Sequence, residues 1–215
     1  QKIATIDAYN SFILNYPKAL DIPLAIKMRN ALAFEQTKKK DDILSYTNFI
    51  KTYPDAVEVE SAKKRIHEIA FEETKSKNTL EAYKNFITQY PGALQTAEAL
   101  TEIYKLAFTA AKAQNNSTSY KAYLTEYPKS PFKDEAQALF ELTEYREMTL
   151  NNTWEVYRDY IETHFKKAYY QDACSKLEAI ALTSSNPKPL LYCIDHHIGN
   201  ENTLINKYYK QVSED

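Results

Sequence analysis

The chain of 215 residues is long enough for one large domain or two small ones, and 44% of its residues are hydrophobic, enough to build a core. Its formal net charge of -2 gives no overall attraction to nucleic acid or to an anionic membrane, and no apolar run approaches the roughly 18 residues that span a bilayer. The only glycines are Gly92 and Gly199, which disfavours the glycine-dependent loops of P-loop, Rossmann and α/β-hydrolase proteins. We therefore expect helices joined by short turns without glycine.

An aromatic pattern recurs every 37 residues from the N-terminus onward. Each copy begins with a tyrosine, at Tyr9, Tyr46, Tyr83, Tyr120 and Tyr157. Three residues later come Phe12, Phe49, Phe86, Tyr123 and Tyr160, each followed by an aliphatic residue. The first four copies then reach Tyr-Pro, at Tyr16, Tyr53, Tyr90 and Tyr127, and the fifth has His164-Phe165. Further in-phase positions are Ala25, Ala62, Ala99, Ala136 and Ala173, then Phe34, Phe71, Phe108 and Tyr145. Five copies in phase indicate a repeat architecture.

The first part of each copy predicts a helix of about three turns, because its aromatic and aliphatic residues recur at i, i+3, i+4 and i+7. These residues more often form a core than a ligand site, with each tyrosine hydroxyl satisfied at the rim. Polar pairs precede these helices, and Asn78 with Glu81, like Asn152 with Glu155, has the spacing of a capping box. The proline of Tyr-Pro disfavours helical geometry at the tyrosine before it, so the first helix should end there.

The second part of each copy predicts a longer helix, for example from Thr96 to Ala113. The small Ala99 on its buried side should let the paired helices approach closely. A hairpin of two such helices cannot bury its apolar face alone, so the copies are expected to stack into a solenoid.

The repeat phase is lost beyond Ser184, where we expect a short helix near Leu190–Ile198 and a last helix near Thr203–Val212. Terminal repeats often diverge because they cover the exposed end of a core. The predicted organisation is therefore five hairpins over residues 1–188 and degenerate capping helices over residues 189–215, with a segment that leads into a further domain as the equal alternative for the latter. The chain begins at Gln1 without a basic-then-apolar leader, so we expect a processed form or a piece of a longer chain.

The spacing of Tyr83, Phe86, Ile87, Tyr90 and the later Ala99 resembles the tetratricopeptide repeat. The Tyr-Pro in "YKNFITQYP" is similar to the variant found in bacterial cell-envelope proteins such as outer-membrane assembly lipoproteins and Tol–Pal accessory proteins. The resemblance covers about residues 4–188. It implies an all-α fold, a right-handed αα-superhelix of five 37-residue hairpins plus a C-terminal helical cap, in an extracytoplasmic or periplasmic bacterial protein.

In the tetratricopeptide fold, first-helix positions that the repeat does not fix line a concave groove. The corresponding candidates for partner binding here are Asn10, Thr47, Lys51, Lys84, Thr88, Lys121, Thr125, Arg158 and Glu162. Among them Lys51, Lys84, Lys121 and Arg158 predict a basic stripe that favours an acidic or carboxylate-bearing peptide, and a merely solvated helix face is the alternative. The two-carboxylate clamp of chaperone-binding tetratricopeptide domains is not matched, because Thr88 and Ala122 stand where amides are needed.

The segment "CIDHH", Cys193 to His197, resembles the signature of the DHH phosphoesterases, which bind two metal ions. That family sets the motif in a Rossmann-like sheet with further aspartate motifs, whereas the pattern here predicts helices. Cys193 with His196 or His197 could also face a zinc ion, but no CxxC or HExxH accompanies them. An incidental helix end is the favoured interpretation, so no metal site is predicted.

The remaining histidines and cysteines predict no catalytic group. His67 lies among charged residues and is expected on a solvated face, and His164 should pack beside a hairpin turn. Cys174 and Cys193 could form one disulfide or none. We expect a non-catalytic scaffold without a cofactor that binds a protein or peptide, and neither nucleic acid binding nor membrane insertion is predicted. The alternatives are a structural spacer of a larger envelope protein and a metal-dependent hydrolase that uses "CIDHH".

Overall fold

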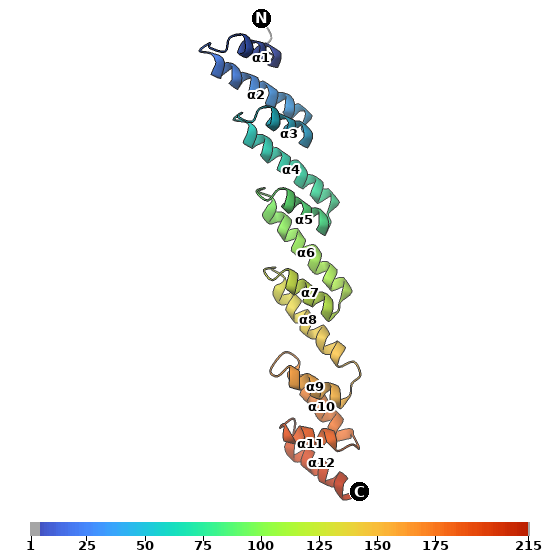
Figure 1. Ribbon diagram of the computed structural model, residues 1–215. Coiled ribbons are helices and arrows are strands. Elements are labelled where there is room, and N and C mark those ends of the chain that lie inside the picture. The colour runs from blue at the N-terminus through green and yellow to red at the C-terminus, as the bar shows by residue number, and fades with distance from the viewer. Residues whose placement is uncertain (1–4, 215) are drawn as a thin grey trace. The chain divides into compact units, whose positions relative to one another are not determined.

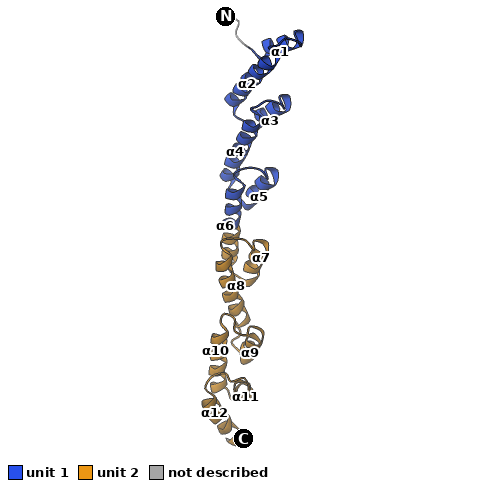
Figure 2. Ribbon diagram, turned by 90° about the vertical axis from the view of Figure 1, so that its left-hand side faces the viewer, with its two compact units in different colours: residues 1–106 blue, residues 107–215 orange. Residues whose placement is uncertain are grey.

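The structure, a computed structural model, describes residues 5–214, and these residues form helices and connecting turns with no strand (Figure 1). Two compact units, residues 1–106 and 107–215, divide within α6 (Figure 2). The first six helices are α1 (Ile6–Asn15), α2 (Ile22–Lys40), α3 (Ile43–Thr52), α4 (Val59–Lys77), α5 (Leu80–Gln89) and α6 (Thr96–Gln114). The others are α7 (Ser117–Glu126), α8 (Lys133–Met148), α9 (Trp154–Thr163), α10 (Tyr170–Thr183), α11 (Lys188–Asp195) and α12 (Glu201–Glu214).

Helices that follow one another in the chain pack together within each unit. In unit 1, α2 contacts both α1 and α3, and α4 contacts both α3 and α5. In unit 2, the contacts run in order from α7 to α12, and α10 also contacts α12. The predicted all-helical class and the sequential packing of helices are therefore confirmed.

Asparagine and aspartate take the place of glycine between the helices. Backbone φ is positive at Asp41, Asn78, Asn115 and Asn152, between 46° and 50°. Residues of these two types adopt the left-handed conformation more readily than other non-glycine residues. Asp41 and Asn78 occupy the C-cap positions of α2 and α4. These four turns lack glycine, as the composition predicts, whereas Gly92 lies between α5 and α6 and Gly199, with a φ of 79°, lies between α11 and α12.

The capping-box prediction for Asn78 and Asn152 is wrong by one residue. Thr79 is the N-cap of α5, where its side chain accepts a hydrogen bond from the Ala82 amide at 3.1 Å, and Asn78 ends the preceding helix. Thr153 likewise holds the N-cap position of α9. The two residues of each polar pair therefore have separate roles, the first in the left-handed turn and the second at the new N-terminus.

The first tyrosine of the repeat is bound to this turn by its hydroxyl group. Tyr46 donates to Asp41 at 3.0 Å, and Tyr157 donates to Asn152 at 2.6 Å. Equivalent bonds join Tyr83 to Asn78 at 3.5 Å and Tyr120 to Asn115 at 3.3 Å. All four tyrosines are buried. Ring packing with a satisfied hydroxyl, as the sequence predicts, is confirmed at these four positions.

Aromatic rings carry the contact between one hairpin and the next. Phe34 of α2 lies 5.2 Å from Phe49 and 6.2 Å from Tyr46, measured between ring centroids. Phe71 of α4 repeats the arrangement, 5.0 Å from Phe86. The alanines Ala62, Ala99, Ala136 and Ala173 are completely buried. The aromatic repeat is thus the core of the fold, and the small alanines lie inside it.

The left-handed turn at Asp41 carries an ion pair with Arg65 of α4. Arg65 donates from Nε to Asp41 Oδ1 at 2.9 Å and from Nη2 to Oδ2 at 2.8 Å. Hydrogen bonds from Arg65 and then Tyr46 lower the pKa of Asp41 from 3.8 to about 2. Because the folded pKa lies below the ordinary value, this stabilisation is complete above about pH 4 and is lost as the pH falls toward 2.

We expect Asp41→Asn to remove this acid-dependent stabilisation while keeping the turn. Asparagine tolerates the backbone and accepts from Tyr46, as it does at three equivalent positions, but it cannot pair with Arg65. The difference in Tm between wild type and Asp41→Asn should shrink as the pH falls from 4 toward 2. Thermal unfolding followed across this range measures it, with the exposed Asp55→Asn as control. A difference that stays constant with pH would contradict the role of the pair.

Candidate functional site

Two hollows in unit 1 are built from equivalent residues of successive copies. The first has a volume of about 240 Å³ between α2 and α3, and the second has about 320 Å³ between α4 and α5. The first is lined by Ala33, Thr37 and Lys40 of α2 and by Asn48, Phe49 and Tyr53, with Ile6 and three more residues. The counterparts 37 residues later, Ala70, Thr74, Lys77, Asn85, Phe86, Tyr90 and Ile43, line the second. The repeat therefore produces one recess per hairpin junction in this unit.

The floor of each hollow is apolar, and the threonine hydroxyl groups beside it already have hydrogen-bond partners. Ala33 with Phe49, and Ala70 with Phe86, are buried. The Thr37 hydroxyl donates to the Ala33 carbonyl oxygen at 3.0 Å, and Thr74 donates to the Ala70 carbonyl oxygen at 2.8 Å. The hydroxyl donors of these threonines are therefore satisfied within their own helices, which leaves ligand binding to other groups.

The rim of each hollow carries an asparagine that is available for binding. Asn48 and Asn85 are exposed, and neither side chain has a hydrogen-bond partner among the described residues. A primary amide offers donors and an acceptor together, which matches the N–H and C=O groups of an extended peptide backbone. Lys40 and Lys77 lie exposed at equivalent points of the two hollows. The arrangement suits reversible binding of a polar chain.

The two hollows differ in charge. Among the described residues, Lys40 is the one charged side chain that lines the first hollow, whereas Lys77 shares the second with Glu73 and Glu81. The first hollow therefore favours an acidic side chain and the second a neutral or mixed one. Both hollows have the asparagine, the buried phenylalanine and the tyrosine. Both can therefore contact the main chain of a bound peptide and a small apolar side chain.

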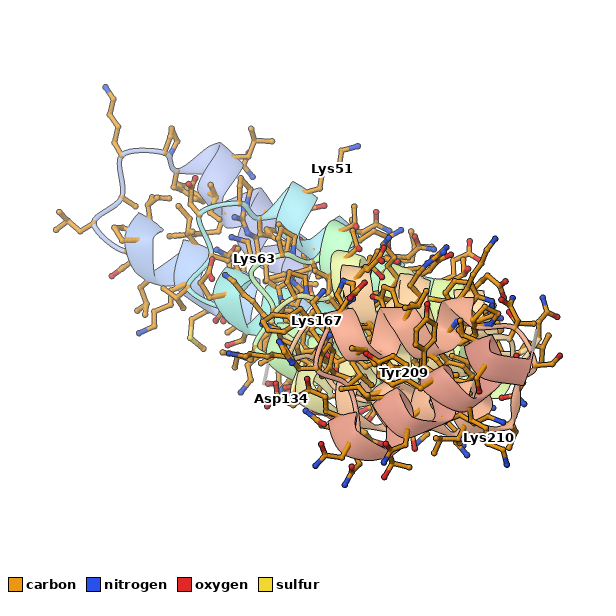
Figure 3. The ribbon with its side chains drawn as sticks, turned by 90° about the horizontal axis from the view of Figure 1, so that it is seen from below. Lys51, Lys63, Asp134, Lys167, Tyr209 and Lys210 are labelled. Atoms are coloured by element: carbon orange, nitrogen blue, oxygen red, sulfur yellow. The ribbon has the colours of Figure 1, made fainter. Side chains whose placement is uncertain are left out.

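The residues predicted to line the groove lie on the first helices but outside these two hollows. Asn10, Thr47, Lys51, Lys84, Thr88, Lys121, Thr125 and Glu162 are exposed, and Arg158 is half-buried. Lys51 points away from the ribbon (Figure 3). Asn10 is the one candidate on α1, whereas α3, α5, α7 and α9 each carry two candidates one turn apart. On α5, the Thr88 hydroxyl donates to the Lys84 carbonyl oxygen at 2.9 Å. The hollows are lined instead by Asn48 and Asn85, each one residue further along its helix than a predicted groove residue. The sequence analysis missed these two asparagines, although their 37-residue spacing could have identified them.

Arg158 differs from the lysines of the predicted basic stripe. Its Nη2 lies 2.6 Å from Asp159 Oδ1, and its guanidinium lies 5.1 Å from the Trp154 ring. Glu162, one turn further along α9, lies near Tyr192 of α11, and burial followed by this negative charge raises the pKa of Tyr192 to about 12. Arg158 and Glu162 thus contribute to packing within unit 2 as well as to its surface.

The side chains of "CIDHH" point to different surroundings. Cys193 is completely buried in a core cluster, and burial raises the pKa of its thiol to about 11. The His196 ring stacks on Tyr192 at 4.0 Å, whereas His197 is exposed with a φ of 53°. Cys174 and Cys193 are free thiols. Over residues 5–214, no group of three or more His, Cys, Asp or Glu side chains is placed to hold a metal ion.

Two other histidines are packed against aromatic rings. His67 is half-buried, and its ring lies 5.2 Å from that of Tyr90, so the prediction of a solvated face is wrong. Tyr90, the C-cap residue of α5 in the following hairpin, supplies this contact. His164 stacks on Tyr160 at 4.3 Å at the end of α9, and its position beside the hairpin turn is confirmed.

Among the described helices, none is long and apolar enough to cross a membrane. Comparison with known proteins assigns no family, because no protein-family model and no curated protein matches the chain.

Proposed function

We propose that the chain is a non-catalytic interaction scaffold that binds an extended peptide segment of a partner protein. The observation that carries this proposal is the pair of in-phase hollows, each with an exposed asparagine above a buried phenylalanine. A site repeated at the period of the fold suits a ligand that is itself extended, since such a ligand presents its main chain at regular intervals. Rigid packing of the hairpins would set the register of the bound chain.

The proposed architecture is a right-handed αα-solenoid of tetratricopeptide-like hairpins over residues 1–188, with residues 189–215 as a cap. Its support is the 37-residue phase together with the sequential packing within each unit. We further propose the basic residues of the first helices, Lys51 and Lys84 in unit 1 and Lys121 and Arg158 in unit 2, as a second set of contacts that favours acidic peptides. The resemblance of the Tyr-Pro copies to envelope proteins supports a role in the bacterial periplasm.

A displayed library of random peptides of about 12 residues, each roughly 40 Å long when extended, tests this function. Peptides selected on the wild-type protein should lose about tenfold in affinity or more on the double variant Asn48→Ala/Asn85→Ala, because each lost amide contact costs about 1 kcal/mol. Fluorescence polarisation with a labelled selected peptide measures the change. The variants should keep the wild-type Tm, because both side chains are exposed.

A charge-reversed variant, Lys84→Glu/Lys121→Glu, separates the two proposed surfaces. Acidic peptides should bind it more weakly, and neutral peptides should bind it as they bind the wild type. Equal affinity for the wild type and both double variants would contradict binding on the first helices. Failure to enrich any peptide would contradict the scaffold function itself.

A further inference from the structure

Each of the two hollows in unit 1 contains one lysine at the same place in the repeat. Lys40 and Lys77 are the last residues of α2 and α4, and both side chains are exposed. Neither ammonium group forms a salt bridge among the described residues. The lysines, like Asn48 and Asn85, are therefore common to both hollows, so they cannot decide which part of a bound peptide lies in which hollow.

Two other positions of the repeat differ in charge between the hollows. Gln36 lines the first hollow, and its counterpart in the second is Glu73. Glu81 also lines the second hollow, whereas its counterpart on α3 is the uncharged Leu44. Both glutamates are exposed, and neither has an ion-pair partner among the described residues. One lysine against two glutamates gives the described lining of the second hollow a net charge of -1, while that of the first is +1.

Asp42 contacts Ser45 at the edge of the first hollow, but its carboxylate is engaged in capping α3. Its Oδ1 accepts a hydrogen bond from the Ser45 amide at 2.7 Å, and its Oδ2 accepts one from the Ser45 hydroxyl at 2.9 Å. At this N-terminus the positive end of the helix dipole offsets the negative charge. Glu73 and Glu81 therefore set the difference in charge between the two hollows.

The opposite net charges of the two hollows favour one register of a bound peptide. An acidic side chain is attracted to the first hollow and repelled from the second, so both effects oppose a shift of that side chain from the first hollow to the second. We propose that charge fixes the register of the bound peptide, with an acidic side chain beside Lys40 and an uncharged one beside Lys77. This inference rests on the proposed function, and it makes the preferred ligand a segment with an acidic residue near one end.

Two fluorescent peptides of 12 residues test the attraction to the first hollow. One is selected on the wild type with a glutamate near one end, and the other has glutamine in its place. Lys40→Gln should bind the glutamate peptide about two- to fivefold more weakly at low ionic strength, as expected for an exposed ion pair, and added salt should remove the difference. The glutamine peptide should bind the wild type and Lys40→Gln equally. Lys39→Gln, at an exposed position that lines neither hollow, is the matched control and should bind both peptides like the wild type.

An exchange of charged and uncharged residues between the two hollows tests the register. The exchange variant gives each hollow the residues of the other at the two positions that differ: Gln36→Glu, Leu44→Glu, Glu73→Gln and Glu81→Leu. With a nitroxide spin label beside its glutamate, the peptide should broaden the side-chain amide signal of Asn48 more than that of Asn85 in the wild type. In the exchange variant the signal of Asn85 should be broadened more. The spin-labelled glutamine peptide should give the same pattern in both proteins.

The outcomes separate the register from the proposed function. Stronger broadening of the same asparagine in both proteins by the glutamate peptide would overturn the register, and so would equal affinity of this peptide for the wild type and Lys40→Gln. Absence of binding by both peptides on the wild type would overturn the proposed function, and the register with it. All four exchanged residues are exposed, so unaltered circular dichroism and Tm are expected and show that folding is not the cause.

Discussion

Replacement of Phe86 by alanine should lower the free energy of unfolding by about 3–5 kcal/mol. The side chain is 3% exposed, and its ring lies 5.0 Å from Phe71 and 5.4 Å from Tyr90. Its removal would leave a cavity where α4 and α5 meet, and the rings around it could close the space only in part. Urea denaturation followed by circular dichroism measures the loss.

Two further phenylalanines provide the controls for this substitution. Phe165→Ala should change the free energy of unfolding by less than about 0.5 kcal/mol, because Phe165 is 62% exposed. Phe12→Ala, at the same repeat position in the partly covered α1, should have an intermediate effect. A cost at Phe86 no larger than that at Phe12 would contradict the role of the preceding second helix in covering this core.

Replacement of Asn152 by valine should cost about 2–3 kcal/mol. The backbone φ of 50° is unfavourable by about 1–2 kcal/mol for a residue with a Cβ, and more so for a β-branched one. The substitution also removes the acceptor of the 2.6 Å hydrogen bond from Tyr157, whose loss adds about 1 kcal/mol. Urea denaturation measures the total.

Glycine and aspartate at position 152 separate the two contributions. Asn152→Gly keeps the left-handed backbone and loses only the acceptor, so it should cost about 1 kcal/mol. Asn152→Asp keeps both features, as Asp41 does in the second copy, and should be nearly neutral. A valine variant as stable as the glycine variant would show that the left-handed turn does not constrain the fold.

The aromatic spacing predicts most of the helical organisation because the period of the sequence is also the period of the core. A second helix from Thr96 to Ala113 is predicted, and α6 runs from Thr96 to Gln114. The mistaken capping role of Asn78 has a local cause. Two adjacent polar residues both suit a helix end, and only the backbone conformation shows that the first ends one helix and the second begins the next.

The hollows could not be placed from the sequence because they depend on how neighbouring helices pack. Thr47 and Asn48 are adjacent in sequence but about 100° apart around α3, so they belong to different stripes of the same helix. Which stripe borders a recess is decided by the position of α2, which the repeat pattern does not contain. The same reason explains His67, which has charged neighbours along α4 but meets Tyr90 of the following hairpin.

Whether Asn48 and Asn85 contact the same bound peptide can be measured by NMR of their side-chain amide groups during titration with a selected peptide. Both amide signals should shift together and saturate at one peptide per chain, while the amide signals of Asn186 and Asn206, outside the hollows, stay in place. Unchanged signals from Asn48 and Asn85 in the presence of saturating peptide would contradict the assignment of the hollows as the binding site.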